Sequence, residues 1–376
     1  MGAVSWAVQA IKYANRIRRD SIRRIRLKKE DVSCRKVKWA SGNRVLLISV
    51  NDRFGDSLFV MGLAHQLRNL GRQVSIATID EAYDRYYCSG IFASVLKLDF
   101  LSERMLDDLA HNVDVVVDLE YTSLKYWEER AKIVRALRHS CAITVQEICK
   151  NLNIFDIYVN YRETDHISLR MGQVLSAVSN TKFSGSPVLP FFMDGIQSGK
   201  TDKSDGCRVL YLNALAGDAD RCLSSSQFDS ILREFLRLKN VDVYINPPSD
   251  WDEPMVFFTN VHKIPKLNFI DFCKFARIFD YVVTPDTSVT HIASFWNCPS
   301  FVIFPPNDRD FYHEFSACEV WGALADKSIS LNTDDPGLVI DQYGFGYPNF
   351  KARPISSIEN ESFLNPLRRH IQEILN

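Results

Sequence analysis

One stretch of the chain, residues 279–306, constrains the fold more than any other. Its sequence, FDYVVTPDTSVTHIASFWNCPSFVIFPP, places two short apolar runs, YVV and FVIF, on either side of a polar turn and a helical segment. Short apolar runs bounded by turn residues are typical of strands buried in a parallel sheet. The stretch therefore predicts a buried strand, a tight loop, a helix and a second buried strand.

The polar turn that begins this helix is a candidate anion site. Asp286 is a good N-cap residue, and Thr287 and Ser288 follow it in the first turn. The backbone N–H groups of a first helical turn, together with the helix dipole, attract anions. His291 lies one turn further on, so it can approach the same ligand. An ordinary capped crossover with a polar first turn explains the same pattern without any ligand.

The alternation of strand and helix patterns continues through the rest of the chain in two series. Buried strands are expected at residues 44–50, 74–79 and 113–119 in the first series, and at 208–212 and 241–245 in the second. Helical patterns separate them. Each series therefore predicts an α/β domain with a doubly wound, open parallel sheet.

The length of the chain also favours two domains, because 376 residues exceed one ordinary core. The polar, glycine-bearing segment from Asp194 to Gly206 is the best candidate for the linker between them. We expect a basic arm at residues 1–40, a first Rossmann-like domain at 41–195, a second at 196–350, and a C-terminal helix at 351–376 that packs back on the first domain.

Positive charge is concentrated in the arm. Residues 1–40 carry 12 Lys and Arg against 3 Asp and Glu, a net charge of +9, whereas the remainder carries −10. Val4, Val8 and Ile11 fall near one face of a helix, and this basic amphipathic pattern favours binding to an anionic membrane surface. A solvated helix packed on the body is the alternative. The acidic body argues against a nucleic-acid partner.

Other sequence patterns narrow the compartment and the cofactors. No apolar run is long enough to span a membrane, and the N-terminus lacks the pattern of a secretory signal. Nine cysteines are scattered singly with no C-x-x-C, which predicts reduced thiols in a cytosolic protein and no cysteine-ligated zinc. The absence of G-x-G-x-x-G disfavours a dinucleotide cofactor.

Phe54-Gly55-Asp56 follows a buried strand, and residues 284–306 contain Asp286-Thr287, His291 and Ala293 before a second buried strand. Together these two motifs resemble the "I-G-D" turn and the "D-T-G-x-x-H-x-A" motif, with the strand that follows it, of the bacterial lipopolysaccharide heptosyltransferases, glycosyltransferase family nine. Ser288 stands where the family usually has Gly, and Phe304-Pro305-Pro306 where it has "F-G-P", so the chain resembles a divergent member. The residues that match the second motif are Asp286, Thr287, His291, Ala293 and Pro299.

The resemblance implies a GT-B fold, in which two Rossmann-like doubly wound domains face a cleft. It also implies an inverting, metal-independent transfer of sugar from a nucleoside-diphosphate sugar, with no further cofactor. Asp56 corresponds to the family's proposed base, which takes the proton of the acceptor hydroxyl. Arg221 is the nearest candidate for the basic residue that meets the phosphates. The donor-binding group is completed by Asp286, Thr287, Ser288 and His291, with Asp286 expected to cap the loop or to meet sugar hydroxyls.

The leading hypothesis is therefore a peripheral enzyme at the cytoplasmic face of the inner membrane. It would transfer a sugar, heptose favoured, to a lipid-linked acceptor of the lipopolysaccharide core or a related surface glycan, with residues 1–40 on the anionic membrane. A UDP-hexose or UDP-N-acetylhexosamine transferase on the same scaffold is the main alternative, because the departures at Ser288 and Pro305 touch the donor loops. A non-catalytic nucleotide-sugar-binding protein and a membrane-associated scaffold protein are further alternatives.

Overall fold

A computed structural model gives the fold of the chain as two compact units. The described residues of the first unit are 42–161, with two gaps, and 168–188; the second unit comprises 165–167 and the described residues from 189 onward. The basic arm expected at residues 1–40 and most of the expected linker lie outside the described part of the chain. The structure describes residues 42–120, 126–145, 154–161, 165–194, 206–252, 259–305, 321–332, 339–340, 346–347 and 355–375.

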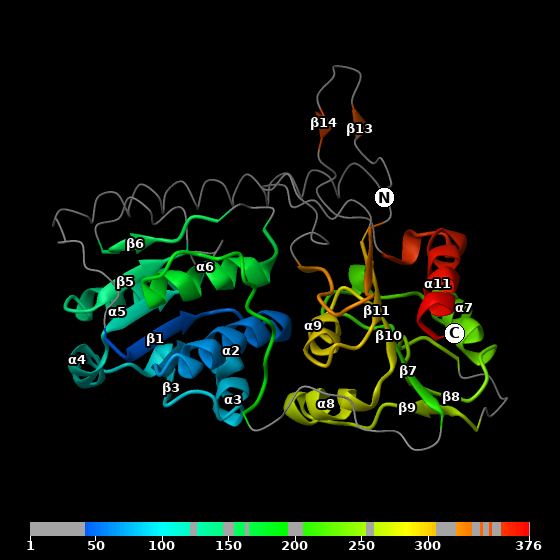
Figure 1. The fold of residues 1–376 in the computed structure, drawn as a ribbon, viewed down its shortest axis with the longest axis horizontal. Coiled ribbons are helices and arrows are strands. Elements are labelled where there is room, and N and C mark those ends of the chain that lie inside the picture. The colour runs from blue at the N-terminus through cyan, green and yellow to red at the C-terminus, as the bar shows by residue number, and fades with distance from the viewer. Residues whose placement is uncertain are drawn as a thin grey trace. The chain divides into compact units, whose positions relative to one another are not determined.

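The first unit is an α/β domain built on one six-stranded sheet with the order β3-β2-β1-β4-β5-β6 (Figure 1). All of its strand pairs are parallel. This is the strand order of a Rossmann sheet, in which the direction of winding reverses between β1 and β4. Its elements are β1 (Arg44–Ser49), α2 (Phe54–Asn69), β2 (Gln73–Thr78), α3 (Asp80–Cys88), β3 (Val95–Lys97), the 3-10 turn η1 (Leu98–Phe100), α4 (Glu103–Asn112), β4 (Val115–Asp118), α5 (Trp127–Ala136), β5 (Cys141–Thr144), β6 (Ile157–Tyr158) and α6 (Ile167–Ser179).

The second unit repeats this topology. Its sheet has the order β12-β11-β10-β7-β8-β9, again with parallel pairs, so that β7 and β10 take the places of β1 and β4. Its elements are β7 (Arg208–Asn213), η3 (Ala219–Arg221), α7 (Ser225–Leu236), β8 (Val241–Asn246), β9 (Val261–Lys263), α8 (Phe269–Phe275), η4 (Ala276–Ile278), β10 (Tyr281–Pro285), α9 (Ser288–Phe295), β11 (Ser300–Phe304), β12 (Ile329–Asn332), the short antiparallel pair β13 (Val339–Ile340) and β14 (Gly346–Tyr347), η5 (Ile355–Ser357) and α11 (Asn360–Leu375).

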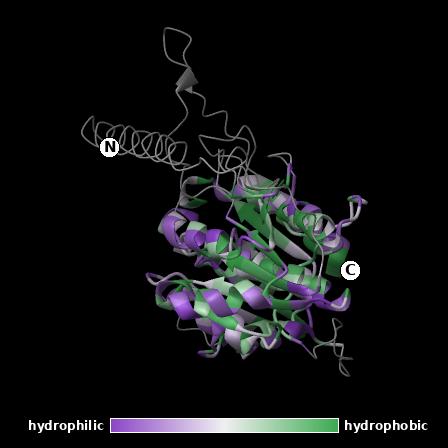
Figure 2. Ribbon diagram, turned by 90° about the vertical axis from the view of Figure 1, so that its left-hand side faces the viewer, coloured by the Kyte–Doolittle hydropathy of each residue, from purple (hydrophilic) through white to green (hydrophobic). Residues whose placement is uncertain are grey.

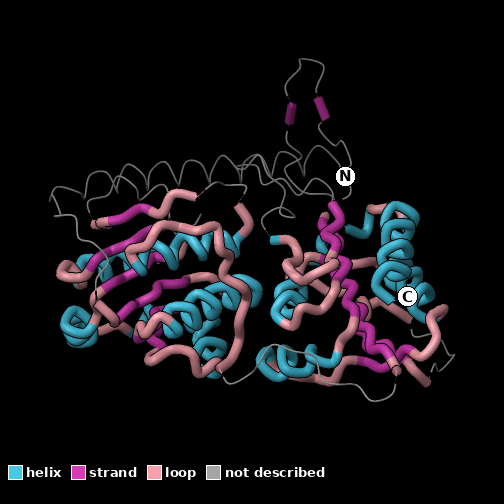
Figure 3. The backbone as a smooth tube through the Cα atoms, in the orientation of Figure 1, coloured by secondary structure: helices cyan, strands magenta, loops and turns pink. Residues whose placement is uncertain are grey.

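The apolar runs of the sequence form the central strands of both sheets. Every residue of β4, β5, β10 and β11 is buried, as expected for strands covered on both faces. Figure 2 shows mainly hydrophobic residues on the strands and both hydrophobic and hydrophilic residues on the helices around them. Figure 3 shows the helices and strands of each unit. Each helix in the described part of the chain is too short or too polar to cross a membrane.

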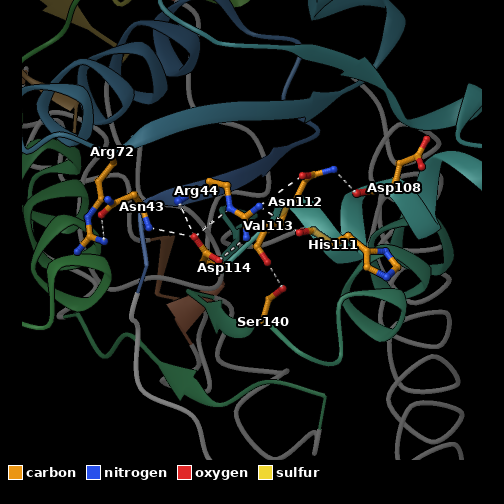
Figure 4. A network of polar contacts seen from close by, with 9 residues as sticks. All are labelled: Asn43, Arg44, Arg72, Asp108, His111, Asn112, Val113, Asp114 and Ser140. Carbon is orange, nitrogen blue, oxygen red and sulfur yellow. Dashed lines mark hydrogen bonds and ion pairs between the residues drawn. The ribbon is translucent and has the colours of Figure 1, made fainter.

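A polar clasp joins the amino ends of β1 and β4 (Figure 4). The Asp114 carboxylate accepts hydrogen bonds from the backbone N–H of Asn43 and of Arg44, at 3.0 and 2.9 Å, and pairs with the Arg44 guanidinium at 2.9 Å. The hydrogen bond from Arg44 holds the pKa of Asp114 below its usual value. Gly42 has a φ of +92°, and a Cβ there would lie 2.5 Å from Asp114, so only glycine fits this approach. The clasp fixes β1 and β4 relative to each other at their amino ends, which is the end of the sheet opposite the one that carries Asp56.

One expectation about the second unit needs correction. The C-terminal helix α11 packs on the core of the second unit, not on the first: Phe363 and Leu367 are fully buried in one hydrophobic cluster with Leu210 of β7 and Phe235 of α7. The apolar stripe of α11 did not specify which domain it would cover.

Candidate functional site

The winding of each sheet reverses at one pair of strands, and the carboxyl ends of that pair are where open α/β sheets bind ligands. In the second unit these strands are β7, which ends at Asn213, and β10, which ends at Pro285. In the first unit they are β1, which leads into the loop before Asp56, and β4. Five of the six site residues expected from the sequence therefore belong to one unit and Asp56 to the other.

A buried ladder of polar side chains ties the strand ends of the second unit together. The Asn213 side-chain amide donates to the Thr284 hydroxyl at 3.0 Å and to the Leu215 carbonyl at 2.8 Å. Its side-chain oxygen accepts from the Asn246 amide at 2.8 Å. Asn213 is only 2% exposed, so these bonds satisfy a polar group that would otherwise be costly to bury. The ladder fixes the ends of β8, β7 and β10 relative to one another.

The ladder continues into the start of α9. The Thr284 and Thr287 hydroxyls are 3.2 Å apart, and the Thr287 hydroxyl accepts the backbone N–H of Val289 at 3.1 Å. Thr287 is therefore the N-cap of α9, and our expectation that Asp286 would cap the helix is wrong. The Asp286 N–H donates to the Ile303 carbonyl at 3.1 Å, so the pairing with β11 continues one residue past the end of β10 at Pro285, and the cap falls on Thr287.

The Asp286 carboxylate is used instead in an ion pair with Arg221. The Arg221 Nη1 atom lies 2.9 Å from Asp286 Oδ2, and the two side chains are 27% and 12% exposed. Arg221 reaches this position because the loop after β7 folds back on itself: the Asp218 side chain caps η3, and the Cys222 sulfur accepts the Ala216 N–H at 3.2 Å. The structure thus brings together two residues that are far apart in the sequence and that we expected to share a donor site.

The first turn of α9 has two backbone N–H groups available near this pair. The N–H of Asp286 and that of Val289 are committed to the bonds already described. Those of Thr287 and Ser288 make no hydrogen bond with other described residues, and both residues are half-buried. Ser288 stands where the heptosyltransferases that the chain resembles usually have glycine. Its φ is not positive, so serine fits this position without backbone strain.

His291 lies on the buried face of α9 rather than in this half-exposed group. It is 3% exposed, and its ring centroid is 6.1 Å from that of Trp321. Burial, with a smaller contribution from His166, lowers the pKa of His291 to about 3. The imidazole is therefore neutral near pH 7. Its expected role as a donor to a phosphate oxygen stays a prediction, and as a neutral group it would bring no positive charge.

In the first unit, Asp56 lies half-buried in the first turn of α2. The side-chain amide of Asn51 donates to Asp56 Oδ2, and the Asn51 oxygen accepts the Arg53 N–H at 2.9 Å. The N-cap position belongs to Arg53, whose side chain makes no capping bond, so Asp56 is not a simple cap. Its charge stabilises the helix N-terminus. A carboxylate held in this way at the carboxyl edge of a sheet is a candidate proton acceptor.

Arg85, which the sequence analysis did not single out, supports the Asp56 loop from α3. Its guanidinium donates to the Ser57 hydroxyl at 2.9 Å and to the Asp52 carbonyl at 2.6 Å, and it lies 4.2 Å from the centre of the Phe54 ring. Burial lowers the pKa of Arg85, against raising effects of Tyr86, Asp52 and Asp56. Position in the fold is the signal that could have identified it, since α3 follows β2 at the same sheet edge as Asp56.

Across the switch point from β1, a fully buried ion pair closes the end of β4. Arg130 and Asp118 are both fully buried, and Arg130 Nη1 lies 2.7 and 2.6 Å from the two carboxylate oxygens. Breaking such a pair leaves an uncompensated buried charge, so it is a fixed part of the scaffold. It ties α5 to β4 beside the loop that carries Asp56.

Asp-x-Asp sequences, which can hold a metal–diphosphate complex, occur at Asp218–Asp220, Asp250–Asp252 and Asp308–Asp310, the last of which lies outside the described residues. Asp218 Oδ1 accepts the backbone N–H of Asp220 at 3.2 Å, and Asp250 accepts the Ser225 hydroxyl at 2.9 Å. Among the described residues no group of three or more His, Cys, Asp or Glu is placed to hold a metal ion. The metal independence implied by the resemblance therefore needs its own experiment.

Neither a family model nor a curated protein matches the chain. Among solved structures, a family 9 glycosyl transferase from Veillonella parvula is 10% identical, with a TM-score of 0.58 over 90% of this chain and 99% of that one. The E. coli heptosyltransferase WaaC, solved with ADP-2-deoxy-2-fluoro heptose, is 12% identical, with a TM-score of 0.57 over 87% and 99% of the chains. E. coli ADP-heptose lps heptosyltransferase II is 10% identical, with a TM-score of 0.55 over 88% and 99%.

These likenesses extend over almost the whole of each neighbouring chain. Together with the two Rossmann-ordered sheets, they confirm the expected two-domain α/β fold of the GT-B class. The sequence identities are too low for the likeness to carry more than the fold.

Proposed function

We propose that the protein is an inverting glycosyltransferase that takes a sugar from a nucleoside-diphosphate donor. The observation that carries this proposal is the group of Arg221, Asp286 and the first turn of α9 at the β7–β10 switch point. It combines a cation and two available backbone N–H groups, which suit a diphosphate, with a carboxylate, which suits sugar hydroxyls. The GT-B fold supports the same assignment, and one structural neighbour, WaaC, was solved with an ADP-heptose analogue.

The two units have separate roles in this proposal. In the second unit, Arg221 and the N–H groups of Thr287 and Ser288 bind the diphosphate and stabilise its charge as it leaves. In the first unit, Asp56 accepts the proton of the acceptor hydroxyl as that oxygen attacks the anomeric carbon. Heptose is the favoured sugar and the lipopolysaccharide core or a related lipid-linked glycan the favoured acceptor. The enzyme would work at the cytoplasmic face of the membrane, with residues 1–40 on the lipid surface.

Replacement of Asp56 tests the catalytic half of the proposal. Asp56→Asn should lower sugar transfer by at least about 100-fold, because a base of this kind contributes about 10²–10⁴ in rate. The affinity for nucleoside diphosphate should change little, since that site lies in the other unit. Transfer is followed by nucleotide release from ADP-heptose, UDP-glucose and UDP-N-acetylglucosamine with a lipopolysaccharide core acceptor. Asp52→Asn, in the same loop, is the matched control, and full turnover by Asp56→Asn would rule out Asp56 as the base.

Chelation in the same assay tests whether a metal takes part. If Arg221 and the helix N-terminus supply the positive charge, EDTA leaves the rate of transfer unchanged. A rate that falls with EDTA and returns with Mg²⁺ or Mn²⁺ would instead assign the diphosphate to a metal complex, with the three Asp-x-Asp sequences as the first residues to replace.

A further inference from the structure

An exposed group of aromatic rings lies on the first unit beside α3. Tyr87 and Phe100 are 66% and 68% exposed, which is unusual for rings of this size. Tyr83 stacks on Tyr87 with ring centroids 5.8 Å apart and an angle of 12° between the planes. We call Tyr83, Tyr87 and Phe100, with Lys97 between them, the aromatic platform.

The platform is held in shape by its charged member. The Lys97 ammonium lies 4.7 Å from the Tyr83 ring centre and 5.9 Å from that of Phe100, and it also pairs with Asp80. Hydrogen bonding to Asp80 raises the pKa of Lys97, so the lysine stays charged. Stacked aromatic rings lose little conformational freedom when a ligand binds, because each has only two side-chain torsions and these are already fixed.

The platform lies at the ligand edge of the first sheet. α3 begins just after β2 ends, and η1, which carries Phe100, directly follows β3. Because the strands are parallel, these elements start at the same sheet edge as the Asp56 loop. Arg85, two residues from Tyr83 and Tyr87 and therefore on the other side of α3, contacts that loop. The platform and the loop are thus separated by about the 10–12 Å diameter of one helix.

The surrounding charge selects the kind of ligand. Asp80, Asp84 and Asp99 are exposed on the elements that carry the rings, and the Lys97 charge interacts with Asp80 and Asp84. This acidic rim repels anionic membranes and nucleic acids. Carboxylates are strong acceptors for hydroxyl donors, and flat aromatic faces suit the C–H faces of sugar rings. Aromatic faces bordered by carboxylates therefore match an uncharged polyhydroxyl ligand.

We propose that the aromatic platform is a remote subsite for uncharged saccharide units of the acceptor glycan. As the acceptor's subsite, it rests on the proposed function: the sugar that reacts lies near Asp56, and units further along the acceptor reach across α3 to the rings. A single sugar does not span that separation, so the platform favours an oligosaccharide over a monosaccharide acceptor. Substitutions there should raise the KM for a long acceptor and leave kcat nearly unchanged, because the rings touch no reacting atom.

Binding is tested on the full chain by saturation-transfer NMR with maltotriose, mannotriose, lactose and N,N′-diacetylchitobiose. We expect at least one of these to bind, and the double variant Tyr87→Ala/Phe100→Ala to weaken it about tenfold. Both side chains are exposed, so the variants should fold. Leu70→Ala, at an apolar side chain of the same unit that is also more than half exposed, should have no effect, and Tyr87→Phe should retain binding.

Three outcomes would overturn the subsite: no saturation transfer to any of the four saccharides, transfer undiminished in the double variant, or ring-dependent sedimentation with phosphatidylglycerol vesicles. Titration of the same samples with ADP and UDP separates this failure from that of the proposed function. Nucleotide binding without ring-dependent saccharide binding refutes the platform alone. Ring-dependent saccharide binding without nucleotide binding refutes the glycosyltransferase and leaves a saccharide-binding surface.

Discussion

Arg221 and Asp286 determine the charge that an anionic ligand meets at the second sheet. Charge-assisted hydrogen bonds to phosphate contribute about 1.5–3 kcal/mol, so Arg221→Gln should weaken nucleoside-diphosphate binding by about 10- to 100-fold. Asp286→Asn should strengthen it, because the variant removes a negative charge beside the phosphates. Titration calorimetry measures both effects. Arg237→Gln, at the exposed arginine that follows the last residue of α7, is the control and should bind like the parent chain.

If the two variants changed nucleotide affinity in the opposite way, Arg221 would have a structural role and would not bind the ligand. If Arg221→Gln binds nucleotide as well as the parent chain while Asp286→Asn loses binding, the carboxylate rather than the guanidinium is the ligand. The site would then suit the hydroxyls of ribose or of the sugar more than the diphosphate.

His291 predicts a dependence of stability on pH. Burial lowers its pKa from 6.5 to about 3, so below pH 6.5 the unfolded chain takes up a proton that the folded chain does not. The contribution of the neutral histidine to the free energy of unfolding is therefore complete above pH 6.5 and is lost as the pH falls toward 3. Below about pH 6 this free energy falls by about 1.4 kcal/mol per pH unit because of His291. Between pH 7.5 and 5, the free energy of unfolding measured with urea should fall less steeply in His291→Gln than in the parent chain.

The control for this experiment is His139→Gln, at an exposed histidine of the first unit, which should keep the slope of the parent chain. Identical slopes for the parent chain and His291→Gln would show that His291 is not held in a neutral state by the fold.

Residue type and spacing in the sequence predicted site roles for Asp56, Arg221 and Asp286. They did not point to Asn213 or Arg85. Asn213 is one polar residue at the end of an apolar run, and its role depends on side chains from β8 and β10 that only the sheet order brings near. The Asp286–Arg221 pair likewise depends on how the loop after β7 folds back.

At the scale of elements, the start of α9 connects the ladder to the anion site. Thr287→Ala removes the N-cap and should destabilise the second unit by about 1 kcal/mol. It should also weaken nucleotide binding, because the freed first turn no longer holds the N–H groups of Thr287 and Ser288 in place. Ser224→Ala removes the N-cap of α7 in the same unit and is the matched control.

Urea unfolding and calorimetric titration of both variants distinguish a local effect from a general one. We expect similar losses of stability but a loss of nucleotide affinity only in Thr287→Ala. Equal losses of affinity in both variants would mean that the cap of α9 has no specific connection to binding.

The sequence predicted the buried strands best, because a short apolar run between turn residues is compatible with few structures other than a buried strand. The sequence analysis did not identify α3 or β3. α3 has only nine residues and a polar N-terminus, and β3 has three half-buried residues, so neither has an apolar run of its own. The helix α11 was predicted as an element but assigned to the wrong unit, since an apolar stripe shows that a helix packs and not on what.

At the scale of the whole molecule, one topology is used twice. Both sheets have the Rossmann strand order, and each places its candidate residues at the carboxyl edge beside its switch point. The alternation of strands and helices predicted this repetition, and the solved structures confirm the fold that the two motifs implied. The donor, the acceptor and the role of residues 1–40 depend on contacts with molecules that the chain alone does not contain.

Calorimetric titration of the full chain with ADP, UDP and GDP is the sharpest test of the proposed donor site. We expect saturable binding of one nucleoside diphosphate per chain, with ADP preferred if the donor is ADP-heptose and UDP preferred if it is a hexose or N-acetylhexosamine donor. No binding of any of the three, down to a dissociation constant on the order of 1 mM, would contradict the assignment of Arg221 and the α9 N-terminus as a diphosphate site.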